Sequence, residues 1–210
     1  MELFEALAGR RSIRKFTGDP VPREDIVKIF EAAGLAPSAG NQQMWQFIAV
    51  TNRSVVEAMR QAVLDKVDEM LTWPEVAGLT PRIKAVKNYA SFFADAPVAI
   101  AGLTKPYDNP IDVMVLPKHG LSYQEIHDLR GDPGTQSFGA AMENLILAAY
   151  ALGYGTCWLT GPLYARVELE KILGVEPPWR LAAVVALGVP AEQPSARPRK
   201  PASELYRFVD

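Results

Sequence analysis

The sequence predicts one domain, residues 1–210, in which helices are mixed with short buried strands. A chain of 210 residues is long enough to bury one substantial hydrophobic core. In several segments apolar residues recur at helical spacing, whereas other apolar runs are too short for helices and are bounded by turn residues. The composition, 49% hydrophobic and 22% charged residues, is typical of a soluble globular protein.

Net charge and cysteine content limit the classes of function. A formal net charge of -2 gives no overall attraction to nucleic acid or anionic lipid, so any basic site must be local. The single cysteine, Cys157, excludes an internal disulfide framework, and its place in an apolar run favours an inert core thiol. Near the N-terminus, acidic residues precede the first basic pair, which is the wrong order for a secretory signal. The sequence therefore predicts a cytoplasmic protein.

The N-terminal region combines a short helix with a basic motif. Apolar residues at helical spacing predict a helix over residues 3–9, and four cations then surround Ser12 in residues 10–16. Arginine is well shaped to bind phosphate, because its planar fork donates two parallel hydrogen bonds. A solvated basic turn is the simpler interpretation of this motif alone. A nucleic-acid interface is less favoured, because no aromatic residue interrupts the cations before Phe16.

The next helix leads into a loop rich in small and amide residues. Residues 23–35 have helical periodicity with two acidic residues in the first turn, and residues 47–51 resemble a strand. The connecting loop, residues 36–46, has the backbone flexibility for close approach to a ligand and amides that donate and accept hydrogen bonds. This combination suits a flat heterocycle with polar edges. An ordinary helix-to-strand loop is the alternative.

The middle of the chain contains two more helices and a long segment of poor periodicity. Helices are predicted over 55–71 and 83–94, followed by a buried strand over 98–103. Residues 105–134 hold prolines, glycines and both histidines, and a segment this long is often functional, so we predict a lid or pocket-covering loop. His119 and His127 lack partners at ligand spacing, and we predict no metal site.

An uncharged stretch at residues 145–159 is the most distinctive feature of the second half. It is too short to span a membrane but predicts a helix without a solvent face, at a centre or an interface of the protein. A buried strand over 156–159 follows. A helix over 165–173 and a strand over 180–188 come next. The tail, residues 189–210, is rich in proline, which predicts an extended segment, and it carries a second basic cluster.

The order of these segments resembles that of one enzyme family. The matching pieces are R-R-S-I-R-K-F at 10–16, A-P-S-A-G-N-Q-Q-M-W-Q-F at 36–47, E-N-L-I-L-A-A-Y-A-L-G-Y-G-T at 143–156 and R-K-P at 199–201. In this combination they resemble the FMN-dependent nitroreductase family. One departure is Met44, where the family usually has proline before the tryptophan.

The resemblance implies an α+β, nitroreductase-like fold with a mixed, mostly antiparallel central sheet flanked by helices. It also implies an intertwined homodimer with an extended C-terminal tail and two FMN sites at the subunit interface. Both basic clusters would then bind one FMN phosphate, through Arg10, Ser12 and Arg14 in front and Arg199 and Lys200 in the tail. In the family, the residue at Arg14 tends to reach the N1 and O2 edge of the flavin.

The remaining cofactor contacts follow from the same resemblance. Arg11 would lie along the ribityl chain, and the backbone of Thr160 and Gly161 would face flavin N5 and O4. From the partner subunit, the contacts would come from residues of the amide-rich loop: Pro37, Ser38, Ala39, Asn41 and Gln43.

The resemblance implies a hydride transfer from NADH or NADPH to flavin N5, followed by reduction of a small electron-poor acceptor such as a nitroaromatic or quinone. No catalytic side chain is expected, because the flavin carries the chemistry. The aromatic residues Tyr107, Tyr123 and Phe138 are candidates for pocket walls. The same scaffold also supports ring dehydrogenation, dehalogenation, flavin fragmentation or a non-catalytic flavin carrier or sensor, and these alternatives stay open. We predict no nucleic-acid or membrane partner.

Overall fold

The computed structural model of the chain describes residues 2–209, and its centre is a single four-stranded sheet. The strands run in the order β1-β2-β4-β3, and every neighbouring pair is antiparallel. Their bounds are Trp45–Val50 for β1, Val98–Thr104 for β2, Gly155–Leu159 for β3 and Arg180–Gly188 for β4. The α+β class and the mostly antiparallel sheet are confirmed. The parallel component in residues 2–209 is an isolated bridge between Ser12 and Thr156.

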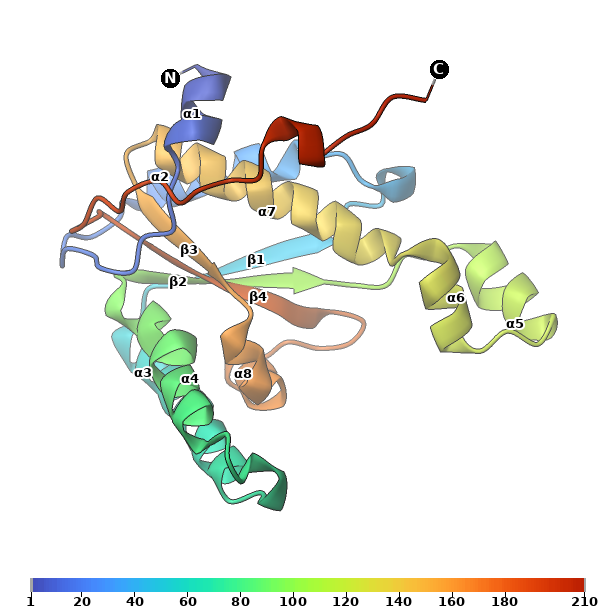
Figure 1. Cartoon of the computed structure of the whole chain (residues 1–210), viewed down its shortest axis with the longest axis horizontal. Coiled ribbons are helices and arrows are strands. Elements are labelled where there is room, and N and C mark those ends of the chain that lie inside the picture. The colour runs from blue at the N-terminus through green and yellow to red at the C-terminus, as the bar shows by residue number, and fades with distance from the viewer. Residues whose placement is uncertain (1, 210) are drawn as a thin grey trace.

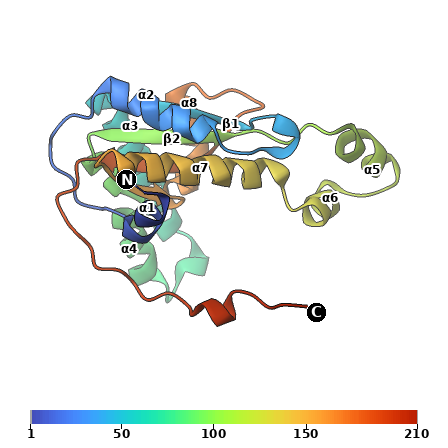
Figure 2. The same ribbon diagram turned by 90° about the horizontal axis from the view of Figure 1, so that it is seen from above.

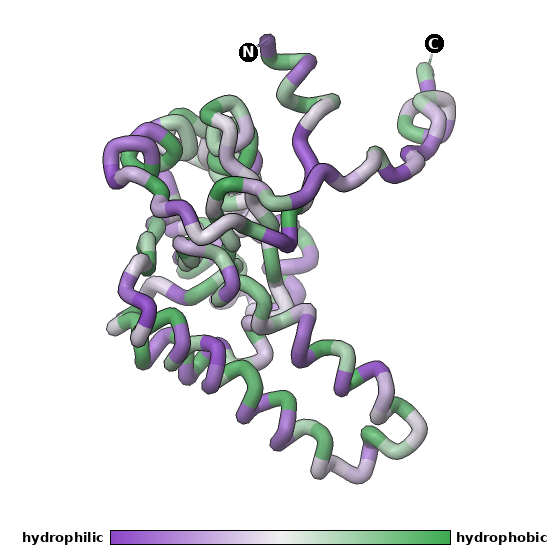
Figure 3. Tube along the Cα trace, turned by 90° about the vertical axis from the view of Figure 1, so that its left-hand side faces the viewer, coloured by the Kyte–Doolittle hydropathy of each residue, from purple (hydrophilic) through white to green (hydrophobic). Residues whose placement is uncertain are grey.

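Helices cover both faces of the sheet (Figure 1). On one face lie α2 (Arg23–Gly34) and α7 (Pro133–Ala151), which run side by side in Figure 2. The other face is covered by α3, α4 and α8, with the bounds Arg53–Leu71, Thr80–Ser91 and Arg166–Leu173. In Figure 3, green and purple alternate along the projecting α3 and α4, as expected of amphipathic helices.

The central strands are buried on both faces, which explains their sequences. In β2, Val98 and Ile100 join the apolar cluster under α2 and α7, whereas Ala99 and Ala101 join the cluster under α3, α4 and α8. A strand with two buried faces needs apolar residues at nearly all positions, and the buried Thr104 that ends β2 has its hydroxyl bonded to a backbone carbonyl. This requirement produces the continuous apolar run seen in the sequence.

Helix α7 buries one face only within its own chain. Leu145 is fully buried against the sheet and α2, whereas Leu147, on the opposite side of the helix, is half-buried. A side chain added at Gly139 would meet nothing within 4 Å. Within residues 2–209 the outer side of α7 is partly open, and α1 packs against it near Tyr150. The prediction of a helix without a solvent face, which placed it at a centre or an interface, is therefore not tested by the single chain.

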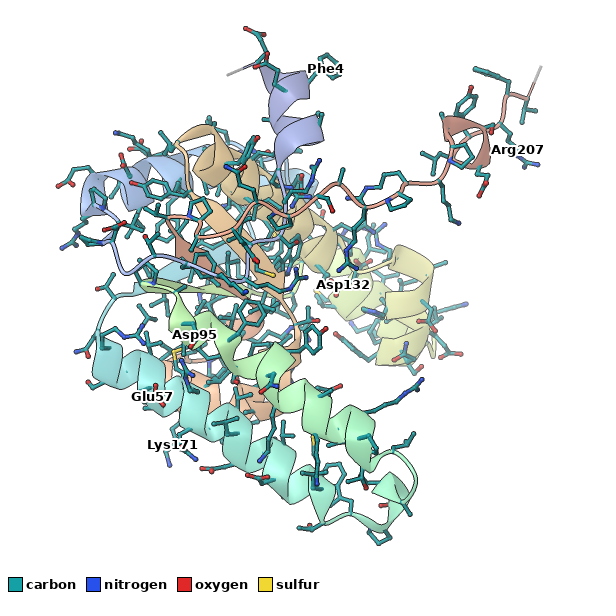
Figure 4. All side chains as sticks on the ribbon, turned by 60° about the vertical axis from the view of Figure 1, so that its left-hand side comes forward. Phe4, Glu57, Asp95, Asp132, Lys171 and Arg207 are labelled. Atoms are coloured by element: carbon teal, nitrogen blue, oxygen red, sulfur yellow. The ribbon has the colours of Figure 1, made fainter. Side chains whose placement is uncertain are left out.

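Both ends of the described chain project from the body. The short α1 (Leu3–Gly9) exposes the apolar side chains that predicted it, among them Phe4, which is labelled at its tip in Figure 4. Beyond residue 192 the tail is extended apart from one turn at Ala202–Glu204, and Arg207 lies far from the sheet in the same figure. Large apolar residues of the tail, including Tyr206 and Phe208, are also exposed.

The segment 105–134 is more regular than its sequence predicted. It contains a π-helical turn at Ile111–Val115, the short α5 (Leu116–Lys118) and α6 (Tyr123–Arg130). Helix α6 begins at a capping box, in which Ser122 and Glu125 bond to each other's backbone N–H groups. In Figures 1 and 2 this segment extends beyond the N-terminal end of α7.

Candidate functional site

The N-terminal basic motif is fixed against the edge of the sheet. The Ile13 N–H donates to the carbonyl of Thr156 at 2.9 Å, which places residues 10–14 alongside β3. The start of the tail then pairs with the motif, because Ala191 N–H donates to the Lys15 carbonyl at 2.9 Å. Two segments from opposite ends of the sequence are thereby held next to each other.

These two segments enclose a hollow of about 440 Å³ that is lined by arginines. Arg10, Arg11 and Arg14 come from the N-terminal motif together with Ser12, and the tail contributes Arg199. None of these arginines forms an ion pair with a carboxylate within residues 2–209. Several like charges without counter-charges repel one another, so this donor set fits an anionic group such as a phosphate.

The tail contributes a residue that the sequence prediction missed. Arg197 lines the hollow beside Arg199, whereas the predicted Lys200 is not among the lining residues. Arg197 belongs to the same basic cluster as the two predicted residues, and membership of that cluster is the signal that could have selected it.

Glu192 supports the motif from the tail and was not predicted either. Its Oε1 accepts hydrogen bonds from the backbone N–H groups of Arg14 at 2.7 Å and Lys15 at 3.1 Å. The carboxylate therefore bonds to backbone N–H groups, and these bonds fix the backbone of Arg14 beside the hollow. A single acidic residue in a basic tail has no spacing pattern that reveals this role.

The amide-rich loop, residues 37–43, adopts a strained backbone at the start of β1. Gly40, Asn41 and Gln43 have φ angles of 57°, 52° and 49°, a left-handed region that is costly for residues with a side chain. Ser38 stabilises the turn, because its Oγ accepts from the Gln43 N–H at 2.9 Å. Pro37 is exposed just before the turn.

Two further contacts attach this loop to the body of the protein. The Ala39 N–H donates to Ser137 Oγ of α7 at 3.1 Å. Met44, which stands where the family has proline, is fully buried, and its carbonyl accepts from Thr104 Oγ1 at 2.9 Å. The departure from the family pattern is thus accommodated by the core, and the polar part of the loop stays at the surface.

Thr160 and Gly161 directly follow β3. Thr160 is exposed, and a side chain at Gly161 would lie 3.2 Å from the Cβ of Ala90 in α4, so a residue without one fits this close approach. Ser12 pairs with Thr156, and Thr160 comes four residues later along the extended chain, a distance of roughly 13 Å. The basic hollow and the Thr160 backbone therefore lie at the two ends of one edge strand.

The loop 37–43 is not brought to this edge by its own chain. It precedes β1, which lies three strand spacings from β3, or about 14 Å across the sheet. The loop lies at the end of the sheet where β2 ends, because Trp45, the first residue of β1, pairs with Thr104. This is the end of the sheet at which β3 finishes, whereas the arginine hollow lies where β3 begins. One chain thus holds the two groups of predicted contact residues at opposite edges of its sheet.

The predicted aromatic walls have different environments. Phe138 is buried in the core between Phe47 and Trp158, with ring centroids 6.5 and 6.3 Å apart, so its prediction as a pocket wall is wrong. Tyr107 lies against Gly40 of the amide-rich loop, and Tyr123 is exposed on α6. Trp158, which was not predicted, is partly exposed on the edge strand two residues before Thr160.

The thiol and the histidines take no part in a reactive or metal-binding cluster. Burial raises the pKa of the Cys157 thiol, although Arg14 and Ser12 oppose this shift, which agrees with an inert core thiol. His127 stacks against Tyr123 on α6. Within the described chain no group of three His, Cys, Asp or Glu side chains could hold a metal ion. No helix there is long and apolar enough to cross a membrane.

Comparison with known proteins assigns the chain to a family. The sequence profile described as the nitroreductase family matches residues 7–189, which is most of the chain. The protein belongs to the nitroreductase family. A relative from Methanothermobacter thermautotrophicus, with the name NADH dehydrogenase/NAD(P)H nitroreductase, is 32% identical over 94% of this chain and 82% of its own length. The 5,6-dimethylbenzimidazole synthase of Rhodospirillum rubrum is 27% identical over 88% of this chain and 80% of its own.

Solved structures of this family have the same fold. A BluB-like flavoprotein from Clostridium difficile covers 100% of both chains with a TM-score of 0.89 and 37% identity. The FMN- and NADPH-dependent nitroreductase NfnB of Sphingopyxis sp. strain HMH also covers 100% of both chains, with a TM-score of 0.76 and 22% identity. The nitroreductase-like fold is therefore confirmed.

Proposed function

We propose that the protein is an FMN-dependent oxidoreductase that uses NADH or NADPH to reduce a small electron-poor acceptor, such as a nitroaromatic or quinone. The observation that carries the proposal is the hollow in which arginines of the N-terminal motif and of the tail converge without counter-charges. Membership of the nitroreductase family and the likeness to an NAD(P)H nitroreductase and a flavoprotein support the same conclusion.

The phosphate end of FMN fits the arginine hollow. Arg10, Ser12 and Arg199 supply charge-assisted and hydroxyl hydrogen bonds to phosphate oxygens, and Arg197 adds a fourth donor group. Arg11 is held close to the backbone, since its Nη1 donates to the Ala8 and Arg10 carbonyls at 2.7 and 2.8 Å. Arg11 therefore contributes local positive potential more than direct bonds.

The ring end of FMN fits the far end of β3. The backbone of Thr160 and Gly161 offers hydrogen-bonding groups to the flavin edge, and Arg14 places a positive charge between the phosphate and the ring. FMN, when bound, would supply the redox chemistry: the hydride of NAD(P)H provides two electrons and one proton for the acceptor, and solvent provides the second proton. Arg14 would stabilise negative charge that develops on the ring during reduction. No side chain of the protein is needed as nucleophile or acid.

We further propose that the site is completed in a homodimer. The contacts assigned to Pro37, Ser38, Ala39, Asn41 and Gln43 require a second copy, because one chain keeps its loop 37–43 and its arginines at opposite edges of the sheet. The outer face of α7 and the exposed apolar residues of α1 and the tail supply surface for such an intertwined dimer. The assignment of one domain, its lid at 105–134 and a cytoplasmic location stay predictions.

A spectroscopic experiment tests the proposal. The purified protein is expected to be yellow and to release FMN on denaturation. Under anaerobic conditions, NADH or NADPH should bleach the flavin band, and a nitroaromatic or quinone should restore it. Donor and acceptor would use the site in turn, so initial rates should follow ping-pong kinetics. A colourless protein that does not bind added FMN would contradict the proposal, whereas bleaching without re-oxidation would indicate a flavin carrier.

Flavin fragmentation is the second candidate, favoured by the likeness to a 5,6-dimethylbenzimidazole synthase. The two functions are separated by the fate of the cofactor. Incubation of the reduced holoprotein with oxygen should leave FMN intact if the protein reduces external acceptors. Stoichiometric loss of FMN, with 5,6-dimethylbenzimidazole detected by mass spectrometry, would favour fragmentation instead.

A further inference from the structure

The segment 105–134, hereafter the lid segment, is bonded near its start to the loop 37–43, hereafter the cofactor loop, and the same loop is bonded to α7 just beyond the end of the segment. The lid segment leaves the sheet at the end of β2 and returns at the start of α7 (Figure 1). A gap of more than 60 residues separates the two segments in sequence. Their attachment is therefore a property of the fold that no local pattern encodes.

The first attachment is a pair of hydrogen bonds from one side-chain amide. Gln42 Nε2 donates to the carbonyl of Asp108 at 2.6 Å, and the Asp108 N–H donates back to Gln42 Oε1 at 3.0 Å. The amide thus pairs with the backbone of the lid segment as a neighbouring strand would. Tyr107 adds a contact, because a side chain at Gly40 would lie 3.4 Å from its hydroxyl.

The second attachment lies just beyond the lid segment, in the N-terminal part of α7. The buried Ser137 Oγ accepts from the Ala39 N–H at 3.1 Å and donates to the Pro133 carbonyl at 2.7 Å. The two ends of the segment also touch, since a side chain at Gly134 would be 2.7 Å from the Lys105 carbonyl. Figure 4 shows Asp132 at this junction between α6 and α7.

The body of the lid segment has polar contacts within itself. Arg130 pairs with Asp112 at 3.1 Å, and Gln124 Nε2 donates to Asp128 at 2.7 Å. Its apolar residues at 113–115 are exposed. The position of the lid relative to the sheet therefore depends strongly on its two ends, and Gln42 holds the first of them.

We propose that Gln42 is a positioning residue that couples the cofactor loop to the lid segment. The proposal rests on the proposed function, in which the cofactor loop lies against bound FMN. Occupancy of the site restrains residues 39–42, and Gln42 transmits this restraint to Asp108 and the lid. The lid then stays closed over the flavin and limits the size of the acceptor. The geometry requires glutamine, because glutamate lacks the donor for the Asp108 carbonyl.

Hydrogen–deuterium exchange of the lid segment tests this coupling. The wild type is compared with Gln42→Ala and Gln42→Glu, each with and without FMN. Gln124→Ala is the matched control, because it removes a hydrogen bond that a side-chain amide makes inside the lid. Residues 109–131 should exchange about tenfold faster in both Gln42 variants, as expected for the loss of roughly 1.4 kcal/mol. The control should leave the lid junction unchanged. FMN should slow exchange of the lid strongly in the wild type and weakly in the Gln42 variants.

Steady-state kinetics supply a second measurement. The KM of the Gln42 variants for a bulky quinone should fall relative to that for a small one, because the lid no longer limits the size of the acceptor. Equal lid exchange in the wild type and Gln42→Ala would overturn the coupling. Loss of flavin from Gln42→Glu without a change in lid exchange would also overturn it, because Gln42 would then serve cofactor retention. If the wild type binds no FMN, the proposed function fails, and the comparison without FMN still decides whether Gln42 holds the lid.

Discussion

Removal of one arginine from each end of the chain should release the phosphate of FMN. In Arg10→Ala/Arg199→Ala, each substitution deletes a charge-assisted bond from the same hollow. The half-buried Arg10 is expected to contribute about 1.5 kcal/mol, and the exposed Arg199 about 1 kcal/mol after solvent screening. Together these losses amount to about 2.5 kcal/mol, or a Kd for FMN that rises roughly 60-fold.

The assay compares two ligands and one neighbouring control. Quenching of flavin fluorescence at fixed ionic strength gives the Kd of FMN and of riboflavin, which lacks the phosphate. The double variant should lose affinity for FMN and change little toward riboflavin. Lys200→Ala is the matched control, because Lys200 is adjacent to Arg199 but outside the hollow.

Two results would refute this reasoning. Equal weakening of FMN and riboflavin would mean that the arginines support the fold of the tail and not the phosphate. A loss in Lys200→Ala as large as that in Arg199→Ala would mean that the tail has a different register when FMN is bound, and that the original assignment of Lys200 was correct.

Three further experiments test the dimer, the acid limit of stability and the thiol. Size-exclusion chromatography of Leu147→Lys should show a folded monomer, and this monomer should lack flavin. Leu145→Lys should not fold, because it buries a charge in the core. A flavin-loaded Leu147→Lys dimer would exclude the outer face of α7 as the interface. The Tyr154 hydroxyl donates to Asp25 at 2.6 Å, and bonds from Lys28 and Tyr154 lower the pKa of Asp25 below 3.8. A carboxyl group whose pKa is lower in the folded than in the unfolded protein stabilises the fold at pH values above its unfolded pKa. Tyr154→Phe should therefore lower Tm at pH 7, and the difference from the wild type should shrink as pH falls below about 3.8. A difference that persists at low pH would contradict the role of Asp25. Cys157 should react with a thiol reagent only after unfolding, since it is buried with a raised pKa, and rapid labelling of the native protein would show that β3 opens.

The elements were predictable where one physical requirement dominates the local sequence. The strand 180–188 coincides with β4, because beyond Arg180 most of its residues are buried and all are apolar or glycine. The helix over 23–35 was found within one residue of α2, since its acidic first turn and apolar period agree. The helix in the lid segment was missed, although Ser122 and Glu125 form a recognisable capping box, because few apolar residues follow it.

The site was less predictable, because its geometry depends on contacts between distant segments. The resemblance to a family placed the two basic clusters in one site, but the choice between Arg197 and Lys200 depends on which side of an extended tail faces the N-terminal motif. Gln42 and Asp108 are 66 residues apart, and an exposed amide in a loop gives no indication of its partner. Such pairings follow from the sheet order and not from any local pattern.

Helix α7 connects the two groups of predicted cofactor contacts, the loop 37–43 and the basic motif. Its N-terminal end holds the cofactor loop through Ser137, and its C-terminal end leads into β3, which carries the basic motif at one end and Thr160 at the other. The helix rises about 1.5 Å per residue, so its 19 residues keep the loop and the motif well apart. A two-fold axis through the outer face of α7 would bring the loop of one copy to the arginines of the other. Dimerisation and cofactor binding would then be one event, which is why loss of the dimer in Leu147→Lys should also remove the flavin.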